Sequence, residues 1–221
     1  PIFIPHRGCP NDCVFCNQRK ITARTDDVTP EDAGRIIDTW LTTLRPSSDV
    51  GKSEGIVEAA FYGGSFTGLP IDEQSSFLEV AWSYKQRGLI DKIHLSTRPD
   101  YIDTQILDNL RRYEVDTIEL GVQSLDDNVL KLSNRGHSAA DVYSAVELIQ
   151  KYGFELGIQL MIGLPGDSEE SCIMSAKKTA EMRPSLARLY PTIVLDETEL
   201  FEMYRRGDYV PLSRKEAVKR T

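Results

Sequence analysis

Three of the chain's four cysteines, Cys9, Cys13 and Cys16, lie within eight residues in the spacing C-x3-C-x2-C. Iron–sulfur clusters are held by cysteine thiolates, usually one for each iron, whereas a structural zinc ion takes four nitrogen or sulfur ligands. Three thiols without a local fourth therefore suit a four-iron cluster in which one iron stays open. An open iron can bind a substrate or a cofactor, so these cysteines are the first candidates for metal ligands.

A zinc site is the alternative for the same three thiols. His6 is the only histidine near the loop, and either His6 or a distant ligand could complete a zinc site. His94 and His137 are isolated in the sequence, and we expect a structural role for each. Cys172 lies far from the loop, and we expect it to be buried as a small apolar side chain and not to serve as a ligand.

The composition is ordinary for a soluble protein, with 40% hydrophobic and 27% charged residues among 221. A formal net charge of −8 argues against a domain that holds nucleic acid by charge alone. No apolar run is long enough to span a membrane, and no secretory signal is visible. Three thiols in one loop make a poor disulfide framework, so we expect a reducing, cytoplasmic setting.

Hydrophobic periodicity and turn residues predict an alternation of strands and helices. This alternation indicates parallel strands joined by crossover helices. Six units are too few for a complete eight-stranded barrel, so we expect a partial (β/α)6 barrel of the α/β class, with an open doubly wound sheet as the alternative. The expected strands cover residues 2–4, 56–62, 92–97, 117–122, 154–162 and 188–194, and the expected helices cover residues 30–44, 72–87, 103–112, 126–132, 141–152, 168–182 and 198–206, with a helix-like stretch over 213–221.

Two of the expected helices have apolar stripes that predict their buried faces. These stripes consist of Ile36, Ile37, Trp40, Leu41 and Leu44 in the first helix, and of Phe77, Val80, Ala81 and Tyr84 in the second.

Polar and glycine residues follow one expected strand after another. Gly63-Gly64-Ser65 follows the second strand, Ser96-Thr97-Arg98 ends the third, and Gln123 ends the fourth. The carboxyl ends of parallel strands meet at one edge, where such folds build their sites. Glycine lets a backbone approach a ligand closely. We therefore expect these segments to line one site.

The cysteine spacing, with the aromatic Phe15 directly before the third cysteine, resembles the radical S-adenosylmethionine superfamily. The resemblance implies that Cys9, Cys13 and Cys16 hold a [4Fe–4S] cluster and that S-adenosylmethionine (SAM) chelates the open iron. It implies further that one electron, from an external donor, cleaves SAM to methionine and a 5′-deoxyadenosyl radical, which abstracts a hydrogen atom from the substrate. Phe15 is then expected near the adenine.

The resemblance also implies contacts to SAM at the strand ends. The superfamily has a Gly-Gly-Glu-like turn whose backbone receives the ammonium group, and this chain has serine in place of the glutamate. An arginine suits the carboxylate of SAM in geometry and charge. The expected contacts are Gly63, Gly64 and Ser65 for the ammonium group, Ser96 and Arg98 for the ribose or carboxylate, Arg135 for the carboxylate, Gln123 at the end of the fourth strand, and Gln159 and Leu164 for the ribose and adenine edge.

Three strings narrow the resemblance. Residues 61–68 (FYGGSFTG), 119–124 (ELGVQS) and 189–192 (LYPT) resemble the radical domain of the Elongator catalytic subunit and its bacterial relatives. This implies tRNA as a partner and wobble-uridine modification as the reaction, although these 221 residues contain no acetyltransferase segment. Residues 1–221 are then expected to form one radical SAM core domain that is cut at both ends.

Two alternatives stay open at this point. Features at residues 122–123 and 134–135 are similar to those of the oxygen-independent coproporphyrinogen III dehydrogenases, which act on a small molecule. Outside the enzymes, the alternative is a metal-stabilised binding module without catalysis.

Overall fold

The computed structural model describes residues 1–4, 7–9, 12–17, 28–44 and 55–221. Within them, six strands pair in parallel as one sheet, in the order in which they occur along the chain. A doubly wound sheet would reverse its strand order at a switch point, so this order selects the predicted partial barrel over the open doubly wound sheet. The strands are β1 (Ile2–Ile4), β2 (Glu58–Gly63), β3 (Lys92–Thr97), β4 (Thr117–Gln123), β5 (Glu155–Ile162) and β6 (Leu186–Pro191).

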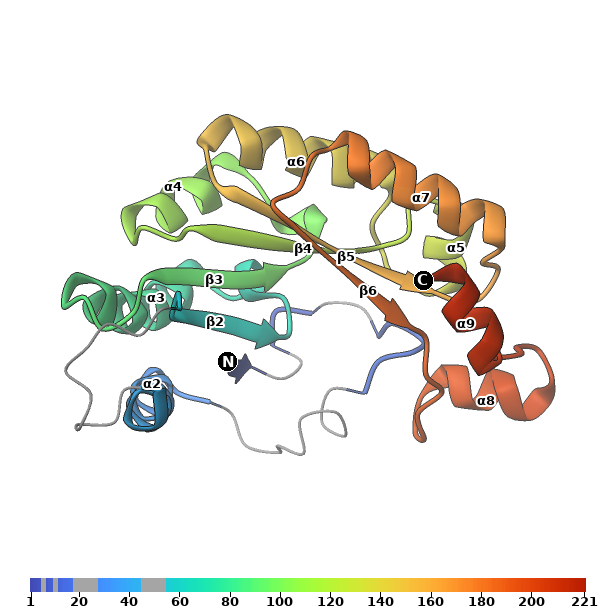
Figure 1. Ribbon diagram of the computed structural model, residues 1–221, viewed down its shortest axis with the longest axis horizontal. Coiled ribbons are helices and arrows are strands. Elements are labelled where there is room, and N and C mark those ends of the chain that lie inside the picture. Colours follow the sequence, from blue (N-terminus) through green and yellow to red (C-terminus); the bar gives the residue numbers. More distant parts are fainter. Residues whose placement is uncertain (5–6, 10–11, 18–27, 45–54) are drawn as a thin grey trace.

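Helices cover the outer face of the sheet from α2 round to α7, and α8 and α9 lie beyond the end of β6 (Figure 1). None of the helices in the described ranges is long and apolar enough to cross a membrane. The helices are α2 (Pro30–Leu44), α3 (Ile71–Gln86), α4 (Thr104–Arg112), α5 (Asp127–Leu132), α6 (Ala139–Tyr152), α7 (Glu169–Glu181), α8 (Glu199–Arg206) and α9 (Arg214–Arg220), with short 3-10 turns η1 (Phe66–Gly68) and η2 (Pro99–Tyr101).

The two faces of the sheet differ in polarity because successive side chains of a strand point to opposite sides. On β4, Ile118, Leu120 and Val122 are buried in the main apolar core. Apolar side chains of the helices outside the sheet belong to the same core. Glu119 and Thr117 alternate with them and therefore face the concave inner side of the sheet, where they meet polar side chains of β3 and β5. The outer face holds the fold together, and the inner face is free to carry polar groups.

The connection between α5 and α6 is held at both ends by helix caps. Asp126 caps α5, since its side chain accepts hydrogen bonds from two backbone amides of the first turn. Ser138 and Asp141 form a capping box at the start of α6. The short segment between these caps contains Asn134 and Arg135. By fixing both ends of the segment, the caps fix the backbone position of these two residues.

The sixth strand differs from its prediction: it covers residues 186–191, whereas residues 188–194 were expected. Pairing with β5 runs in register from Leu186 to Pro191, and the Thr192 amide still donates to the Ile162 carbonyl at 2.9 Å. Only β5 pairs with β6, so this strand lies at an edge and its apolar residues are largely exposed. Apolar letters alone therefore placed its boundaries poorly.

The predicted buried stripe of the first helix is also wrong in part. Ile37 is buried, but Trp40 is 50% exposed and Leu44 is 51% exposed. Helix α2 packs on α3 beside β1, the other edge strand of the sheet, so only one side of the helix is covered. The second predicted stripe is largely confirmed, because Phe77, a residue of α3, is fully buried.

This difference between two helical aromatic residues can be measured. We expect Phe77→Ala to lower the free energy of unfolding by about 3–5 kcal/mol, because it empties a filled site in the core. Trp40→Ala should cost less than about 1 kcal/mol, since half of the side chain is already in water. Urea denaturation followed by circular dichroism measures both. Equal losses in the two variants would contradict the packing of α2.

Candidate functional site

The segment that leads into the cysteine loop lies backbone to backbone against the turn after β2. The Ser65 amide donates to the Arg7 carbonyl at 2.9 Å. A Cβ atom at Gly64 would overlap the Arg7 carbonyl, and one at Gly8 or Gly68 would overlap the backbone of the facing segment. Three glycines thus let the chain approach itself, which is a different use from the ligand approach that the sequence predicted. The contact positions Cys9, the next residue along the chain.

Three hydrogen bonds tie the other side of the loop to two distant segments. The Val14 amide donates to the Ser133 carbonyl at 3.2 Å, and the Leu200 amide donates to the Val14 carbonyl at 2.7 Å. The Asn134 side chain donates to the Asp12 carbonyl at 2.8 Å. The loop is therefore positioned by the α5–α6 connection and by the start of α8, and the sequence signalled neither.

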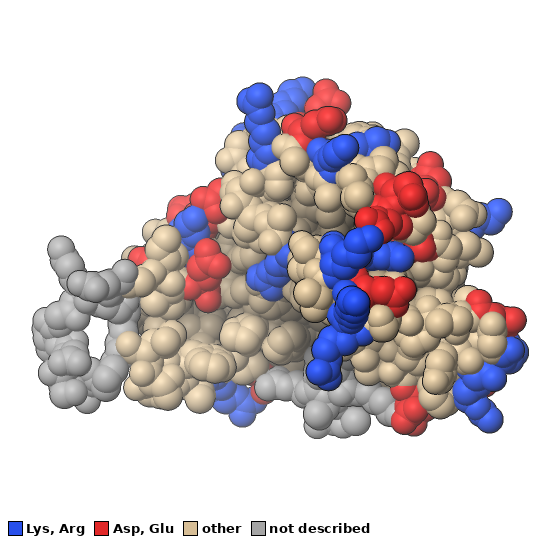
Figure 2. Space-filling view, turned by 45° about the vertical axis from the view of Figure 1, so that its right-hand side comes forward, with Lys and Arg blue, Asp and Glu red and all other residues tan. Residues whose placement is uncertain are grey.

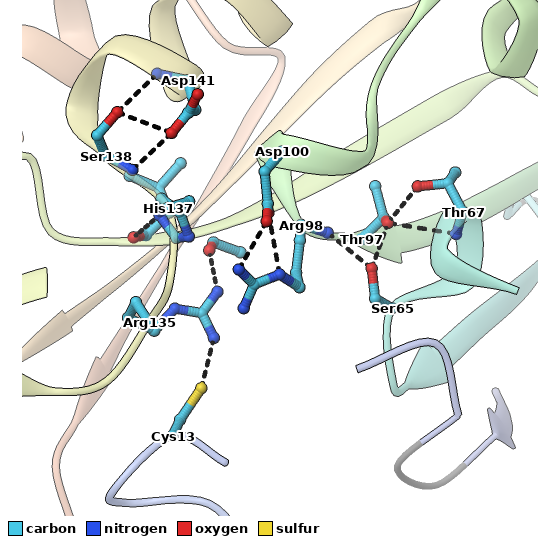
Figure 3. Close-up of polar contacts among 12 residues, drawn as sticks. Cys13, Ser65, Thr67, Thr97, Arg98, Asp100, Arg135, His137, Ser138 and Asp141 are labelled. Atoms are coloured by element: carbon cyan, nitrogen blue, oxygen red, sulfur yellow. Dashed lines mark hydrogen bonds and ion pairs between the residues drawn. The ribbon is translucent and has the colours of Figure 1, made fainter. Parts of the chain in front are cut away.

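Cys13 and Arg135, predicted separately, are in direct contact. Arg135 Nη1 donates to the Cys13 sulfur at 3.2 Å, and its Nη2 donates to the Gly121 carbonyl at 2.6 Å (Figure 3). Gly121 belongs to β4, so one buried guanidinium links the cysteine loop to the middle of the sheet. Such a donor stabilises negative charge on the sulfur.

Cys9 lies in the electrostatic reach of the same groups. Burial raises the pKa of the Cys9 thiol, and charge on Cys13 acts in the same direction. The positive charges of Arg135 and Arg98 and the backbone of Ser65 act to lower that pKa. The two cationic side chains therefore favour thiolates at a place where burial and mutual repulsion oppose them.

Cys16 is partly exposed, and its amide donates to the Cys13 carbonyl at 3.0 Å in a turn of the loop. In the described ranges, no three side chains of Cys, His, Asp or Glu converge closely enough to hold one metal ion. A four-iron cluster does not require such convergence, since each thiolate binds its own iron. The donor set fits that group: three thiols in one loop, with a guanidinium on one sulfur. His6, the predicted alternative ligand, lies outside the described residues.

A buried hydroxyl cluster joins the turn after β2 to the end of β3. Ser65 Oγ lies 2.8 Å from Thr97 Oγ1, which lies 2.6 Å from Thr67 Oγ1 (Figure 3). The Arg98 amide donates to Ser65 Oγ at 3.2 Å. Ser65 is thus occupied as a structural bridge. Thr97 lies in a segment that the sequence placed at the site, whereas the sequence did not single out Thr67 as a site residue.

Arg98 was predicted to contact the cofactor, but its guanidinium is already paired. Its Nε and Nη2 donate to the two carboxylate oxygens of Asp100 at 2.9 and 2.8 Å. The arginine is buried, so this two-point ion pair occupies two of its nitrogens and fixes the direction of the guanidinium. Asp100 lies two residues from Arg98, a spacing that could have indicated the pair.

Other predicted residues meet on the inner face of the sheet. Gln159 of β5 donates to Ser96 of β3 at 3.3 Å, across the strand between them. Gln123 ends β4 with a left-handed backbone (φ 67°) at a register shift. That bend places the Gln123 side chain next to Gly121. The Arg135 guanidinium lies next to the same glycine. The sheet therefore brings four of these predictions into one region.

The two predicted apolar contacts lie toward the C-terminal part of the chain. Phe15 packs against a small cluster that includes Leu200 and Tyr209. The Tyr209 hydroxyl donates to the Gly163 carbonyl at 2.6 Å, and Leu164 beside it is buried. These contacts connect the cysteine loop to the turn after β5.

Cys172 differs from its prediction as a buried apolar side chain. It is partly exposed, and its thiol donates to Asp167 at 2.9 Å. Burial, together with Asp167, raises the pKa of Cys172 to about 11, so it stays a neutral thiol. His94 and His137 are buried and hydrogen-bonded, in agreement with the structural roles expected for them.

Comparison with known proteins decides the family. The family model of the Radical SAM superfamily matches residues 3–178, and that of the Radical_SAM C-terminal domain matches residues 184–221. The chain belongs to the radical SAM superfamily. This confirms the resemblance predicted from the cysteine spacing, and the chain is a radical SAM enzyme.

Among its relatives are proteins of the Elongator group. The chain is 29% identical to a tRNA uridine(34) acetyltransferase of Methanocaldococcus infernus, over 76% of this chain and 35% of that protein. It is 30% identical to Elongator complex protein 3 of Homo sapiens, with the same two coverages. A solved structure of Elp3 from Methanocaldococcus infernus has the same fold, with a TM-score of 0.72 at 23% identity over 99% of this chain and 52% of that one. The radical SAM chain thus spans about a third to a half of the length of these proteins.

The backbone contact at the cysteine loop predicts a strong effect of one methyl group. We expect Gly64→Ala to lower the free energy of unfolding by about 1–3 kcal/mol and to speed alkylation of Cys9 and Cys13, because the loop must move away from the turn. Gly55→Ala is the control, since a Cβ there meets nothing within 4 Å. Denaturation and timed alkylation with peptide mass spectrometry measure both. Unchanged alkylation in Gly64→Ala would refute the positioning role.

His137 predicts a pH dependence of stability. Burial, with the positive charges of Arg135 and Arg98, lowers the pKa of His137 from 6.5 to about 4. The unfolded chain therefore binds the proton more readily, so this contribution to stability is complete above pH 6.5 and is lost as the pH falls toward 4. The slope is at most about 1.4 kcal/mol per pH unit.

His137→Gln should remove this part of the slope, since glutamine does not titrate. Urea denaturation at several pH values, with wild type and variant compared at each, measures the difference. Identical pH slopes would show that His137 is not buried in its neutral form.

Proposed function

We propose that this radical SAM enzyme holds a [4Fe–4S] cluster on Cys9, Cys13 and Cys16 and binds SAM at the carboxyl edge of the sheet. The observation that carries the proposal is the hydrogen bond from Arg135 to the Cys13 sulfur. The same guanidinium donates to the Gly121 carbonyl of β4, which fixes it against the sheet. When bound, the cluster and SAM supply a one-electron cleavage that yields a 5′-deoxyadenosyl radical for hydrogen abstraction from the substrate. The electron comes from an external donor.

The chain's own residues support this proposal by charge. Thiolates on a cluster carry negative charge that a buried site must offset. Arg135 donates to one sulfur, and the positive charges of Arg135 and Arg98 both act to favour the Cys9 thiolate. Asp100 holds Arg98 in place, so we assign Arg98 the role of a fixed positive charge in place of a direct contact to SAM.

The SAM contacts follow from which groups remain accessible. An ammonium group only donates, so its partners in this turn would be carbonyl oxygens, for which we propose those of Gly63 and Gly64. The Ser65 carbonyl already accepts from the Gly68 amide at 2.9 Å. Ser96 and Gln123 supply polar groups near the ends of β3 and β4, Gln159 supplies one within β5, and Phe15 supplies partly exposed apolar surface. Leu164 is buried, so we assign it the packing of the turn after β5 in place of a direct contact.

For the substrate we propose uridine at the wobble position of tRNA, on the basis of the names of the relatives. Figure 2 shows Lys and Arg side chains next to Asp and Glu side chains on the face in view. Charge on that face does not favour a polyanion, so recognition would depend on contacts to the base itself. Residues 1–221 would then act as the radical SAM core of a longer cytoplasmic protein.

Anaerobic reconstitution tests the proposed cluster. Wild type should take up about four iron and four sulfide per chain and form 5′-deoxyadenosine from SAM after reduction. Cys13→Ala should lower iron to background and abolish 5′-deoxyadenosine, because one ligand and the contact to Arg135 are lost together.

Cys172→Ala is the matched control and should behave as wild type, since that thiol pairs with Asp167 instead. One equivalent of zinc and no 5′-deoxyadenosine would favour the binding module. SAM cleavage that responds to a porphyrinogen and not to tRNA would favour the small-molecule alternative.

A further inference from the structure

A network of charged side chains crosses the concave face of the sheet beside the proposed SAM site. Its centre is Glu119 of β4, which is fully buried. One carboxylate oxygen lies 3.0 Å from His94 Nε2 of β3, and the other lies 3.1 Å from Arg188 Nε of β6. A buried carboxylate without partners is costly, so its two partners account for its presence in the interior.

A missing side chain makes the long reach of Arg188 possible. Strand β5 lies between β4 and β6, and its Gly157 pairs in register with Glu119. A Cβ at Gly157 would lie 2.9 Å from Glu119 Cγ, which is too close for any real side chain. The glycine leaves a gap above β5, and through it Arg188 contacts a carboxylate two strands away.

Arg188 also contacts a side chain on the far side of the sheet, Tyr62 of β2. Its Nη2 donates to the Tyr62 hydroxyl at 2.7 Å, and its guanidinium carbon lies 5.1 Å from the centre of the Tyr62 ring. Tyr62 belongs to β2 and is separated from β6 by three strands, so this bond spans the open side of the barrel. Arg188 is in register with Gln159, which is in register with Gly121, the partner of Arg135. The bridge therefore lies in the same layer as the proposed cofactor site.

The bridge leaves hydrogen-bond donors to spare. Arg188 is 39% exposed, and its third nitrogen has only a 3.5 Å contact with the Tyr190 hydroxyl. A guanidinium has more N–H groups than these contacts use. Burial raises the pKa of Tyr62, so its hydroxyl keeps its proton, and since it accepts from Arg188 that proton is available for donation. A ligand here would meet donors next to an aromatic ring.

The surrounding charges exclude an anion as the natural ligand. Among the strand residues that the structure describes, the charged side chains of the concave face are Lys92 and Arg188, which are basic, and Glu58, Glu119 and Glu155, which are acidic. Even a protonated His94 would only make the two signs equal. A phosphate or carboxylate would find no surplus positive charge, whereas the carbonyl oxygens of a neutral ring require only donors.

We propose that Arg188 and Tyr62 bind the base of the substrate, a neutral pyrimidine with two carbonyl oxygens, and that they select uracil over cytosine. Cytosine presents an amino group where uracil has its second oxygen, and that group would face N–H and O–H donors. The inference rests on the proposed function, since it names the subsite for the wobble base. Arg188 and Tyr62 are specificity residues that contact the substrate, and Glu119 and Gly157 position them.

Photocrosslinking tests this without the cluster. The probe is a tRNA anticodon stem-loop with 5-bromouridine at the wobble position, which keeps both carbonyl oxygens. We expect the crosslink in the peptides that contain Tyr62 or Tyr190, and we expect it to fall about tenfold or more in Arg188→Gln and in Tyr62→Phe. The same RNA with 5-bromocytidine should crosslink weakly. The control variants Arg205→Gln and Tyr204→Phe alter exposed α8 side chains and should crosslink as wild type does.

A second measurement separates this inference from the proposed function. The KM for the stem-loop should rise about tenfold in Tyr62→Phe, which keeps the ring. In the control variant Tyr204→Phe, both this KM and SAM cleavage without RNA should be unchanged. Crosslinks confined to the outer helices, no crosslink at all, or equal crosslinking of uridine and cytidine would each overturn the subsite. Absence of SAM cleavage in wild type, with the crosslink intact, would instead overturn the proposed cluster chemistry and leave the base contact standing.

Discussion

The close approach of residues 7–9 to the turn after β2 is the constraint on which the site depends. Three glycines face backbone across this contact, and no side chain could replace their hydrogen atoms without moving one segment. The turn is itself held to β3 by the hydroxyl groups of Ser65 and Thr97. The position of Cys9 is therefore inherited from the sheet through backbone geometry, which is stiffer than any side-chain contact.

The two matched parts of the chain meet at the same loop. Leu200 and Tyr209, in the part that matches the C-terminal family model, contact Val14 and the Gly163 turn. The α5–α6 connection contacts the loop from the other side through Ser133, Asn134 and Arg135. The short apolar cluster at Phe15 is thus part of the site's construction and not a satellite of the main core. A loop held from three directions can keep three thiols in place before any metal binds.

The two faces of the sheet are stabilised by different interactions. Outside, apolar side chains of strands and helices exclude water, and their burial provides the stability. Inside, Glu119 forms ion-pair contacts with His94 and Arg188, and these contacts offset the cost of burying its carboxylate. The same network leaves donors exposed next to the site, which connects the stability of the fold to the choice of substrate.

The sequence alone determined the strand and helix positions closely and the parallel fold, because periodicity is a local property of the chain. The cysteine spacing indicated the family, and the resemblance pointed to Arg135 and Gln159, which the structure places beside Cys13 and Ser96. The tertiary structure alone decided that Gly64 faces the chain itself, that Asp100 binds the Arg98 guanidinium, and that Trp40 is exposed. It also decided that Arg188 reaches Glu119 across Gly157. These contacts depend on strand register and on the curvature that brings β2 toward β6, and no local pattern of residues encodes which side chains meet across them.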